Sequence, residues 1–276
     1  MTQKIKYPLI VSDFDGTLVK SDGTVSDFSK STIKEYMKNG GIFAISTGRM
    51  PAGILPRVKE LGLSGFACCA QGSIIVDVET NEVILQGTIP NEIAVQICEK
   101  MEEMGLHIHV YDLWEYYSNM DDDALKMYEN IVKAKAKLIL EKPISKFVKE
   151  TGLCPCKILA MVHPADNERV RVELDNQSFA GCNVTRSSIY LVEVGSATYS
   201  KGTSLEFLSK KYNIPIENTI AIGDQVNDLS MIEAAGLGLA VQNADEALKS
   251  KATVLKDTHD EDAVAKAILQ YAYEEI

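Results

Sequence analysis

Short apolar, β-rich runs alternate with segments of helical periodicity at both ends of this chain of 276 residues. A strand that is apolar on both faces must be covered on both faces, which is typical of parallel sheets flanked by helices. The alternation therefore predicts one α/β unit built from the two ends of the chain. Strands are expected at 7–12, 42–46, 65–70, 219–222 and 237–241, and helices at 29–39, 50–61, 203–212, 228–235 and 262–272.

The middle of the chain follows a different pattern. Its expected elements are a hairpin strand at 107–111, a lysine-rich helix at 132–140, and β-rich runs at 157–163 and 188–194. We therefore predict a core formed by residues 1–84 and 194–276, with an inserted α+β domain at 85–193. An insertion at a strand end would lie over the sheet edge where such folds bind ligands, so it could act as a lid.

The charge balance limits the choice of partner. The chain carries 39 acidic and 28 basic residues, a net charge of −11, which disfavours a nucleic acid or an anionic membrane. An anionic substrate would need help from a metal ion or from a few placed lysines and arginines. No apolar run approaches the ~20 residues that cross a bilayer. The six cysteines are irregularly spaced and indicate reduced thiols, so a cytoplasmic location is expected.

Four groups of polar residues follow predicted strands or begin a helix. They are Asp13 with Asp15, the segment 46–49 (STGR), Lys201, and the segment 223–228 (GDQVND). The carboxyl ends of parallel strands share one edge of a sheet, so these groups are expected to converge there. Hydroxyls and a lysine favour an anion, whereas several carboxylates favour a divalent cation. Phosphate together with Mg²⁺ satisfies both requirements.

Phosphoryl transfer assigns different tasks to the paired aspartates. Asp13 can attack phosphorus as a carboxylate nucleophile, and Asp15 can protonate the leaving oxygen and later deprotonate water. A carboxylate that attacks a phosphate dianion needs Mg²⁺ to offset the repulsion; its expected ligands are Asp13, the Asp15 carbonyl group and Asp224. Thr47 and Lys201 would then hold the phosphate oxygens.

Further residues of the same segments complete the expected site. Gly48 is expected beside the phosphate, and Asn227 could hydrogen-bond either Lys201 or the phosphate. Asp228 could orient Lys201 or a metal-bound water. Ser46 adjoins Thr47, so the identity of the phosphate-binding hydroxyl is open by one residue.

The segments DFDGTL, STGR, SKG and GDQVND occur in this order, with a long insertion between the second and third. In this respect the chain resembles the haloacid dehalogenase superfamily of phosphotransferases, and most of all its Cof-type phosphatases with a C2B cap. The resemblance implies a Rossmann-like, doubly wound parallel-sheet core and an inserted cap. It also implies Mg²⁺-dependent hydrolysis of small phosphate esters, often sugar phosphates or phosphorylated cofactors.

Residue by residue, the family's motifs match five positions of this chain. The implied roles are nucleophile for Asp13, acid/base for Asp15, phosphate hydroxyl for Thr47, phosphate lysine for Lys201 and metal ligand for Asp224. Two departures lie near strand ends. Gln71 stands where asparagine is common, and the segment 241–244 reads VQNA instead of the more usual MGNA.

The sequence does not match the motifs of three other common binding sites: the EF-hand, the P-loop and the dinucleotide-binding loop. Counted from Asp13, an EF-hand loop would need glycine at Leu18 and glutamate at Thr24. The segment GSATYSKGT, which starts at Gly195, has Ser200 where a P-loop needs its second glycine. No GxGxxG follows the first strand, which weighs against a dinucleotide enzyme.

The sequence is also compatible with two functions other than that of a phosphatase. A sugar phosphomutase would use the same aspartyl-phosphate and return the phosphoryl group to its substrate. A sensor or interaction module would bind a phosphate ligand without turnover. In each case the expected partner is a small phosphate ester, with neither nucleic acid nor membrane, and the oligomeric state is left open.

The insert itself carries no motif that identifies a substrate. Its aromatic run 111–117 favours strand core over a substrate pocket. His107 and His109 share one strand face, but without an acidic or cysteine partner at metal spacing they are not expected to bind metal. The acidic run 121–123 is typical of a solvated helix start.

Overall fold

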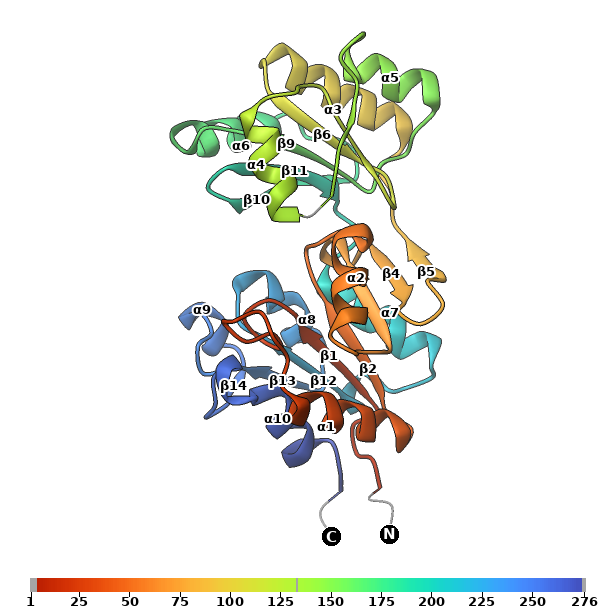
Figure 1. Cartoon of the computed structure of the whole chain (residues 1–276), viewed down its shortest axis with the longest axis vertical. Helices are drawn as coiled ribbons and strands as arrows, with labels where there is room; N and C mark the ends of the chain where they lie inside the picture. Colours follow the sequence, from red (N-terminus) through yellow and green to blue (C-terminus); the bar gives the residue numbers. More distant parts are fainter. Residues whose placement is uncertain (1–3, 133, 275–276) are drawn as a thin grey trace. The chain divides into compact units, whose positions relative to one another are not determined.

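The structure, a computed structural model, describes residues 4–132 and 134–274. The chain forms two compact units, shown in Figure 1. The core unit comprises the described parts of residues 1–49, 54–85 and 199–276, and the inserted unit comprises 50–53 and the described parts of 86–198. The assignment of these units to a catalytic core and a cap stays a prediction.

The core unit is built on one sheet of eight strands in the order β14-β13-β12-β1-β2-β3-β4-β5. The pairs from β14 to β3 are parallel, and β4 runs antiparallel to β3. All residues of β1 and β12 are buried, as expected for strands covered on both faces. The strands are β1 (Leu9–Asp13), β2 (Ile42–Ser46), β3 (Phe66–Cys69), β4 (Ile74–Asp77), β5 (Val83–Gln86), β12 (Thr219–Gly223), β13 (Leu237–Ala240) and β14 (Thr253–Val254).

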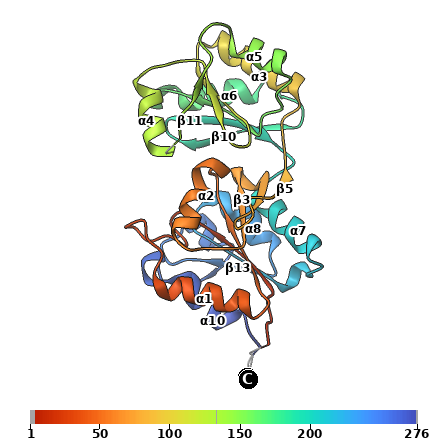
Figure 2. The ribbon, with the colours of Figure 1, turned by 45° about the vertical axis from the view of Figure 1, so that its right-hand side comes forward.

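Helices cover both faces of this sheet. The crossovers β1–α1–β2 and β12–α8–β13 run in opposite directions along the sheet, and right-handed crossovers then place α1 and α8 on opposite faces. Helix α10 packs beside α1, and α7 packs beside α8 (Figures 1 and 2). The predicted α/β, doubly wound fold is therefore confirmed. The α-helices of the core unit are α1 (Asp27–Lys38), α2 (Pro51–Glu60, whose first three residues are grouped with the inserted unit), α7 (Lys201–Lys211), α8 (Leu229–Ala234), α9 (Glu246–Lys249) and α10 (Ala263–Tyr271).

Helix α7 begins two residues earlier than the expected start at Thr203. A capping box explains the difference: Thr203 N donates to Ser200 Oγ at 3.2 Å, and Ser200 N donates to Thr203 Oγ1 at 2.8 Å. Ser200 is therefore the N-cap and Lys201 lies in the first turn. Local capping thus places the lysine at the end of the helix that adjoins the sheet edge.

The inserted unit has its own six-stranded sheet in the order β10-β11-β9-β6-β7-β8. One face carries an apolar core in which Ile108 and Val110 meet residues of α3, α5 and α6. The opposite face carries His107, His109 and Tyr111. Its strands are β6 (His107–Tyr111), β7 (Tyr116–Ser118), β8 (Lys137–Leu138), β9 (Lys157–Met161), β10 (Cys182–Ser188) and β11 (Leu191–Ser196), and its helices are α3 (Asn91–Glu103), α4 (Asp123–Val132), α5 (Ile144–Thr151) and α6 (Asn167–Asp175).

Short 3₁₀ turns connect several elements of both units. They are η1 (Ala70–Gly72), η2 (Pro164–Asp166), η3 (Ile216–Asn218), η4 (Val226–Asp228) and η5 (His259–Glu261). Among the described residues, no helix is long and apolar enough to cross a membrane. All six cysteines are free.

The expected lysine-rich helix at 132–140 is wrong. Helix α4 ends at Val132, Lys133 lies outside the described residues, and 137–138 form strand β8 beside β7. Alternating lysine and alanine have high helix propensity, but their period of two suits a strand, and the pairing with β7 decides the outcome. Glu129 assists, because its Oε1 accepts a hydrogen bond from Ala136 N at 2.9 Å.

The acidic run does start a helix, and one of its carboxylates lies beside His107. Helix α4 begins at Asp123, and Asp122 Oδ1 accepts from Leu125 N at 2.8 Å. The other oxygen, Asp122 Oδ2, lies 3.2 Å from His107 Nδ1, so this histidine does have an acidic neighbour. No triad of metal-ligating atoms forms there among the described residues.

We predict that Asp262→Asn lowers the free energy of unfolding by about 1 kcal/mol at pH 7. Asp262 Oδ1 accepts from Ser26 Oγ at 2.6 Å and from Ser29 Oγ at 3.1 Å, and lies 3.2 Å from Lys20 Nζ. Partial burial raises the pKa of Asp262, but the donated hydrogen bonds, led by that of Ser26, outweigh it and lower the pKa overall.

Because the folded-state pKa of Asp262 is lowered, its charge stabilises the fold above the unfolded pKa of about 3.9, and this contribution is lost as the pH falls through the folded pKa. Urea titrations of wild type and Asp262→Asn should therefore differ at pH 7 and converge as the pH falls below about 4. A difference that stays constant with pH would contradict this account.

Candidate active site

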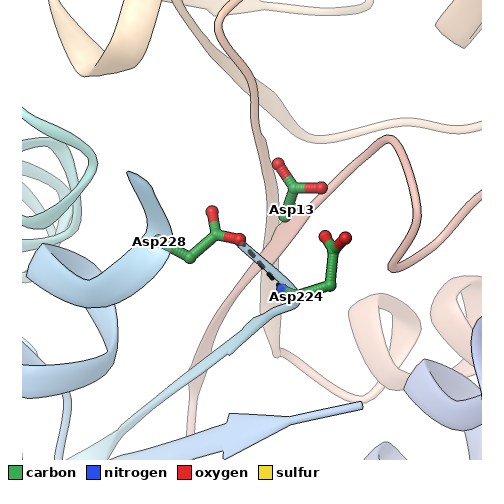
Figure 3. A group of neighbouring side chains, drawn as sticks. All are labelled: Asp13, Asp224 and Asp228. Atoms are coloured by element: carbon green, nitrogen blue, oxygen red, sulfur yellow. Dashed lines mark hydrogen bonds between the residues drawn. The ribbon is translucent and has the colours of Figure 1, made fainter. Parts of the chain in front are cut away.

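The site lies where the sheet changes direction. The connections of β1 and β12 lead to opposite sides, and this switch point is where open α/β sheets bind their ligands. Ser12 pairs with Ile222, so Asp13 and Gly223 end adjacent strands at the same edge. Asp224 follows at once, and Figure 3 shows Asp13, Asp224 and Asp228 gathered there.

Lys201 joins two of these carboxylates. Its Nζ donates to Asp13 Oδ1 at 2.5 Å and to Asp228 Oδ1 at 2.6 Å. Lys201 is 1% exposed and Asp228 is 0% exposed, so water does not solvate this pair. Burial lowers the pKa of Lys201, but the charges of Asp13 and Asp228 outweigh it and raise the pKa above its usual value. The lysine is therefore held as a cation.

Burial and neighbouring charges also shift the pKa of Asp13, and burial acts on it in the direction opposite to its effect on Lys201. Burial raises the pKa of Asp13 well above its usual range; Lys201 opposes this shift, and Asp228 and Asp224 add to it. Burial also raises the pKa of Asp224. Three carboxylates therefore lie near one ammonium group, which bonds two of them, and the cluster has an excess of negative charge.

Asp228 connects Lys201 to the loop that carries Asp224. Its Oδ2 accepts from Asp224 N at 2.9 Å and from Gln225 N at 3.0 Å; Figure 3 draws the first of these bonds. A Cβ at Gly223 would lie 2.5 Å from the Asp228 Cβ, so only glycine permits this close turn. Both oxygens of Asp228 are thus engaged within the protein.

Asp224 is held by a residue to which sequence reasoning gave no role. Thr17 Oγ1 donates to Asp224 Oδ1 at 2.8 Å, and Gln225 Nε2 donates to Asp224 Oδ2 at 3.3 Å. A Cβ at Gly16 would lie 2.6 Å from Asp224 Oδ2, and Gly16 has φ of +85°. In the sequence, the feature that could have indicated this role is the position of Thr17 directly after the turn at Gly16.

The donor set fits a hard divalent cation. Asp13, Asp224 and Asp228 each offer a carboxylate oxygen within 4.8 Å of the others, and magnesium prefers oxygen ligands. Asp228 is held by the buried Lys201 and by backbone N–H groups, whereas the hydrogen bonds to Asp224 come from side chains at 2.8 and 3.3 Å. Asp13 and Asp224 are therefore the carboxylates better able to turn toward an ion. A cation there would also offset the excess negative charge of the cluster.

Asp15 is exposed and turned toward an arginine. Arg49 Nε donates to Asp15 Oδ2 at 2.9 Å, and Arg49 Nη2 donates to Asp15 Oδ1 at 2.8 Å. The sequence places Arg49 within the STGR segment but predicts no role for it. Its signal was the position of this arginine at the carboxyl end of β2, next to β1.

The two candidate hydroxyls are both buried. Arg49 N donates to Thr47 Oγ1 at 3.2 Å, which leaves the hydroxyl proton of Thr47 available. Ser46 Oγ has no hydrogen-bond partner among the described residues. The choice between Ser46 and Thr47 therefore stays open, as expected from the sequence. Gly48 is half-buried beside them.

Asn227 lies exposed at the rim of the cluster. Its Nδ2 donates to Gln71 Oε1 at 3.4 Å, whereas Lys201 bonds Asp13 and Asp228. Asn243, the asparagine that the segment VQNA shares with the family pattern, donates through Nδ2 to Gly16 O at 2.9 Å and places that segment beside the turn after β1. Both departures therefore lie near the predicted site.

A family model described as haloacid dehalogenase-like hydrolase matches residues 10–268. The chain belongs to the haloacid dehalogenase-like hydrolase family. The resemblance carried by the four motifs is thus confirmed. A solved structure, a haloacid dehalogenase-like hydrolase from Bacteroides thetaiotaomicron, superposes with a TM-score of 0.84 at 32% identity, covering 96% of this chain and 99% of that one.

Two named relatives of this family member are phosphatases. Phosphatase YwpJ of Bacillus subtilis is 28% identical, with 93% of this chain and 97% of the relative covered. The 5-amino-6-(5-phospho-D-ribitylamino)uracil phosphatase YcsE of the same organism is also 28% identical, with 96% of each covered. The family member described here is accordingly a phosphoric monoester hydrolase.

We predict that Asp228→Ala destabilises this phosphatase by about 3–5 kcal/mol, because it removes one of two anionic partners of a fully buried lysine. It also leaves the backbone N–H groups of Asp224 and Gln225 without their acceptor. Urea denaturation measures the change, with exposed Asp27→Ala as the control. A loss below about 1 kcal/mol would contradict this role for Asp228.

We predict that Arg49→Met lowers kcat/KM by about tenfold, because Asp15 loses the bidentate partner that orients it. The pair is half-exposed, so little change in stability is expected. Steady-state kinetics test this, with Arg171→Met, which breaks a surface pair with Glu168, as the control. Equal kinetics in the two variants would exclude an orienting role for Arg49.

Proposed function

We propose that this chain is a Mg²⁺-dependent phosphatase that hydrolyses a small phosphorylated metabolite, either a sugar phosphate or a phosphorylated cofactor, through an aspartyl-phosphate. One observation carries the proposal: the buried Lys201 ammonium binds Asp13 and Asp228 beside Asp224, at the switch point of the sheet. This places a fixed carboxylate, a cation and a metal-ligand set within one small volume.

Asp13 is the nucleophile. Lys201 holds Asp13 Oδ1, so the other oxygen, Oδ2, attacks phosphorus. A bond forms between Asp13 and phosphorus while the bond from phosphorus to the ester oxygen breaks. Fixing the carboxylate before attack removes much of the entropic cost of the step.

Asp15 moves the proton. It donates a proton to the leaving ester oxygen and then accepts one from the water that attacks the aspartyl-phosphate. That second attack releases inorganic phosphate and restores the Asp13 carboxylate. Asp15 is exposed and therefore accessible, and Arg49 sets the direction of its carboxylate.

The phosphate is held by groups from three loops. Lys201 supplies the charge, Thr47 or Ser46 supplies a hydroxyl, and Gly48 and Asn227 border the same side. Asp13, the Asp15 carbonyl group and Asp224 would hold Mg²⁺, with Asp228 in support. The ion would neutralise the repulsion between carboxylate and phosphate.

The substrate class rests on the relatives. YcsE is named for a ribityl phosphate that is joined to a uracil ring, so phosphorylated sugars and cofactor precursors form the first panel to test. The acidic chain, with a net charge of −11, makes a nucleic acid or a membrane surface a poor partner. A cytoplasmic location belongs to the same proposal.

The test measures release of inorganic phosphate from that panel with and without Mg²⁺. We expect turnover that a chelator abolishes and Mg²⁺ restores, with no isomeric sugar phosphate formed. Asp13→Asn should lower kcat by at least about 10³-fold with the fold intact, because the attacking oxygen is replaced. The matched control is Asp27→Asn at the exposed start of α1. Full activity of Asp13→Asn would refute the nucleophile assignment, and isomer production would indicate a phosphomutase.

A further inference from the structure

Turn η1 has an unusual backbone. Ala70, Gln71 and Gly72 have successive φ values of 48°, 57° and 93°. The left-handed region is easy for glycine but costs a residue with a Cβ about 1 kcal/mol or more. Two such residues in a row persist only where the surroundings compensate.

The surroundings of η1 are the loops of the predicted site. Ala70 N donates to Arg49 O at 2.8 Å, and Gln71 N donates to Thr47 O at 3.1 Å. On the other side, a Cβ at Gly72 would lie 2.1 Å from Ser200 O, so this glycine packs directly against the N-terminus of α7. The turn is therefore wedged between the STGR loop and the helix that carries Lys201.

The Gln71 side chain extends these contacts. A Cβ at Gly48 would lie 2.6 Å from Gln71 Nε2 and 3.3 Å from its Cδ, so the amide nitrogen of Gln71 packs directly against Gly48. Its Oε1 accepts from Asn227 Nδ2 at 3.4 Å. That hydrogen bond is long, so the packing against Gly48 is the closer of the two side-chain contacts, while the main-chain bond to Thr47 fixes the backbone of Gln71.

Backbone geometry alone does not account for glutamine here. A position with φ near +57° is best filled by glycine, and next by asparagine, because their backbones tolerate the left-handed region. Glutamine keeps the strain and adds an amide that reaches two loops. The contacts of the Gln71 amide with Gly48 and Asn227 therefore offer a reason for keeping a strained backbone at this position.

We infer that Gln71 is a positioning residue for phosphate: its carboxamide holds Gly48 and Asn227 in the arrangement that binds the phosphate oxygens. The inference rests on the proposed function of this site. Gln71 acts through these two residues and takes no part in bond making. Losing it should weaken phosphate binding in the ground state and the transition state alike.

Uniform loss of binding has a recognisable kinetic signature. KM rises while kcat changes little, since both states lose the same interaction. The dissociation constant of inorganic phosphate, the product, should rise by the same factor. Each is expected to rise about tenfold, the usual effect of one lost hydrogen-bonding arrangement around a charged group.

The key variant is Gln71→Gly, because glycine relieves the left-handed strain and keeps the turn. We expect its unfolding midpoint to equal or exceed that of wild type, while KM and the phosphate dissociation constant rise. Asn213→Gly is the matched control, since Asn213 is exposed and has φ of 54° beyond the end of α7. It should change neither constant.

A double-mutant cycle tests the route through Asn227. Gln71→Leu keeps the size of the side chain and removes both polar atoms. If Gln71 acts through Asn227, Gln71→Leu should add little to the loss already caused by Asn227→Ala. Full additivity would remove Asn227 from the account, and unchanged constants in Gln71→Gly would overturn the inference as a whole.

Calorimetric titration with inorganic phosphate in the presence of Mg²⁺ keeps the two proposals separable. If wild type releases no phosphate from any ester, the proposed function fails, while phosphate affinity still reports on Gln71. If wild type is active and Gln71→Gly binds phosphate as wild type does, the inference alone fails.

Discussion

The buried Lys201 ammonium is the interaction on which the arrangement of this site depends. A lysine removed from water is costly unless anionic partners surround it, and Asp13 and Asp228 supply two at 2.5 and 2.6 Å. These bonds join the end of β1, the start of α7 and the turn before α8. One side chain thus ties together three segments that are far apart in the sequence.

Close backbone packing makes that arrangement possible. Gly16 lets the chain turn beside Asp224, Gly223 admits the Asp228 side chain, and Gly72 lets η1 approach the start of α7. In each case a Cβ would lie within 2.6 Å of a neighbouring atom. The loops are therefore in van der Waals contact around the carboxylates, which excludes water and strengthens the electrostatic interactions.

Much of this was predictable because the motifs are local. A recognisable strand ends at Asp13, another ends just before Thr47, and a third ends at the start of the segment 223–228. The carboxyl ends of parallel strands share one edge of the sheet. The pairings between loops were not predictable: Asp15 with Arg49, Thr17 with Asp224, and Gln71 with Asn227. None follows from spacing, because each joins residues on different segments. The helix expected at 132–140 was wrong for a related reason, since pairing with β7 overrode local propensity.

The sequence by itself determined the α/β class, the family and the set of reactive groups, because periodicity, four ordered motifs and residue chemistry are properties of short segments. Only the tertiary structure decided how those groups are used. It showed that Lys201 is shared between Asp13 and Asp228, that Asp15 faces Arg49, and that a strained turn places Gln71 over Gly48. Distances between segments and the burial of charge arise only when the sheet and its loops pack together.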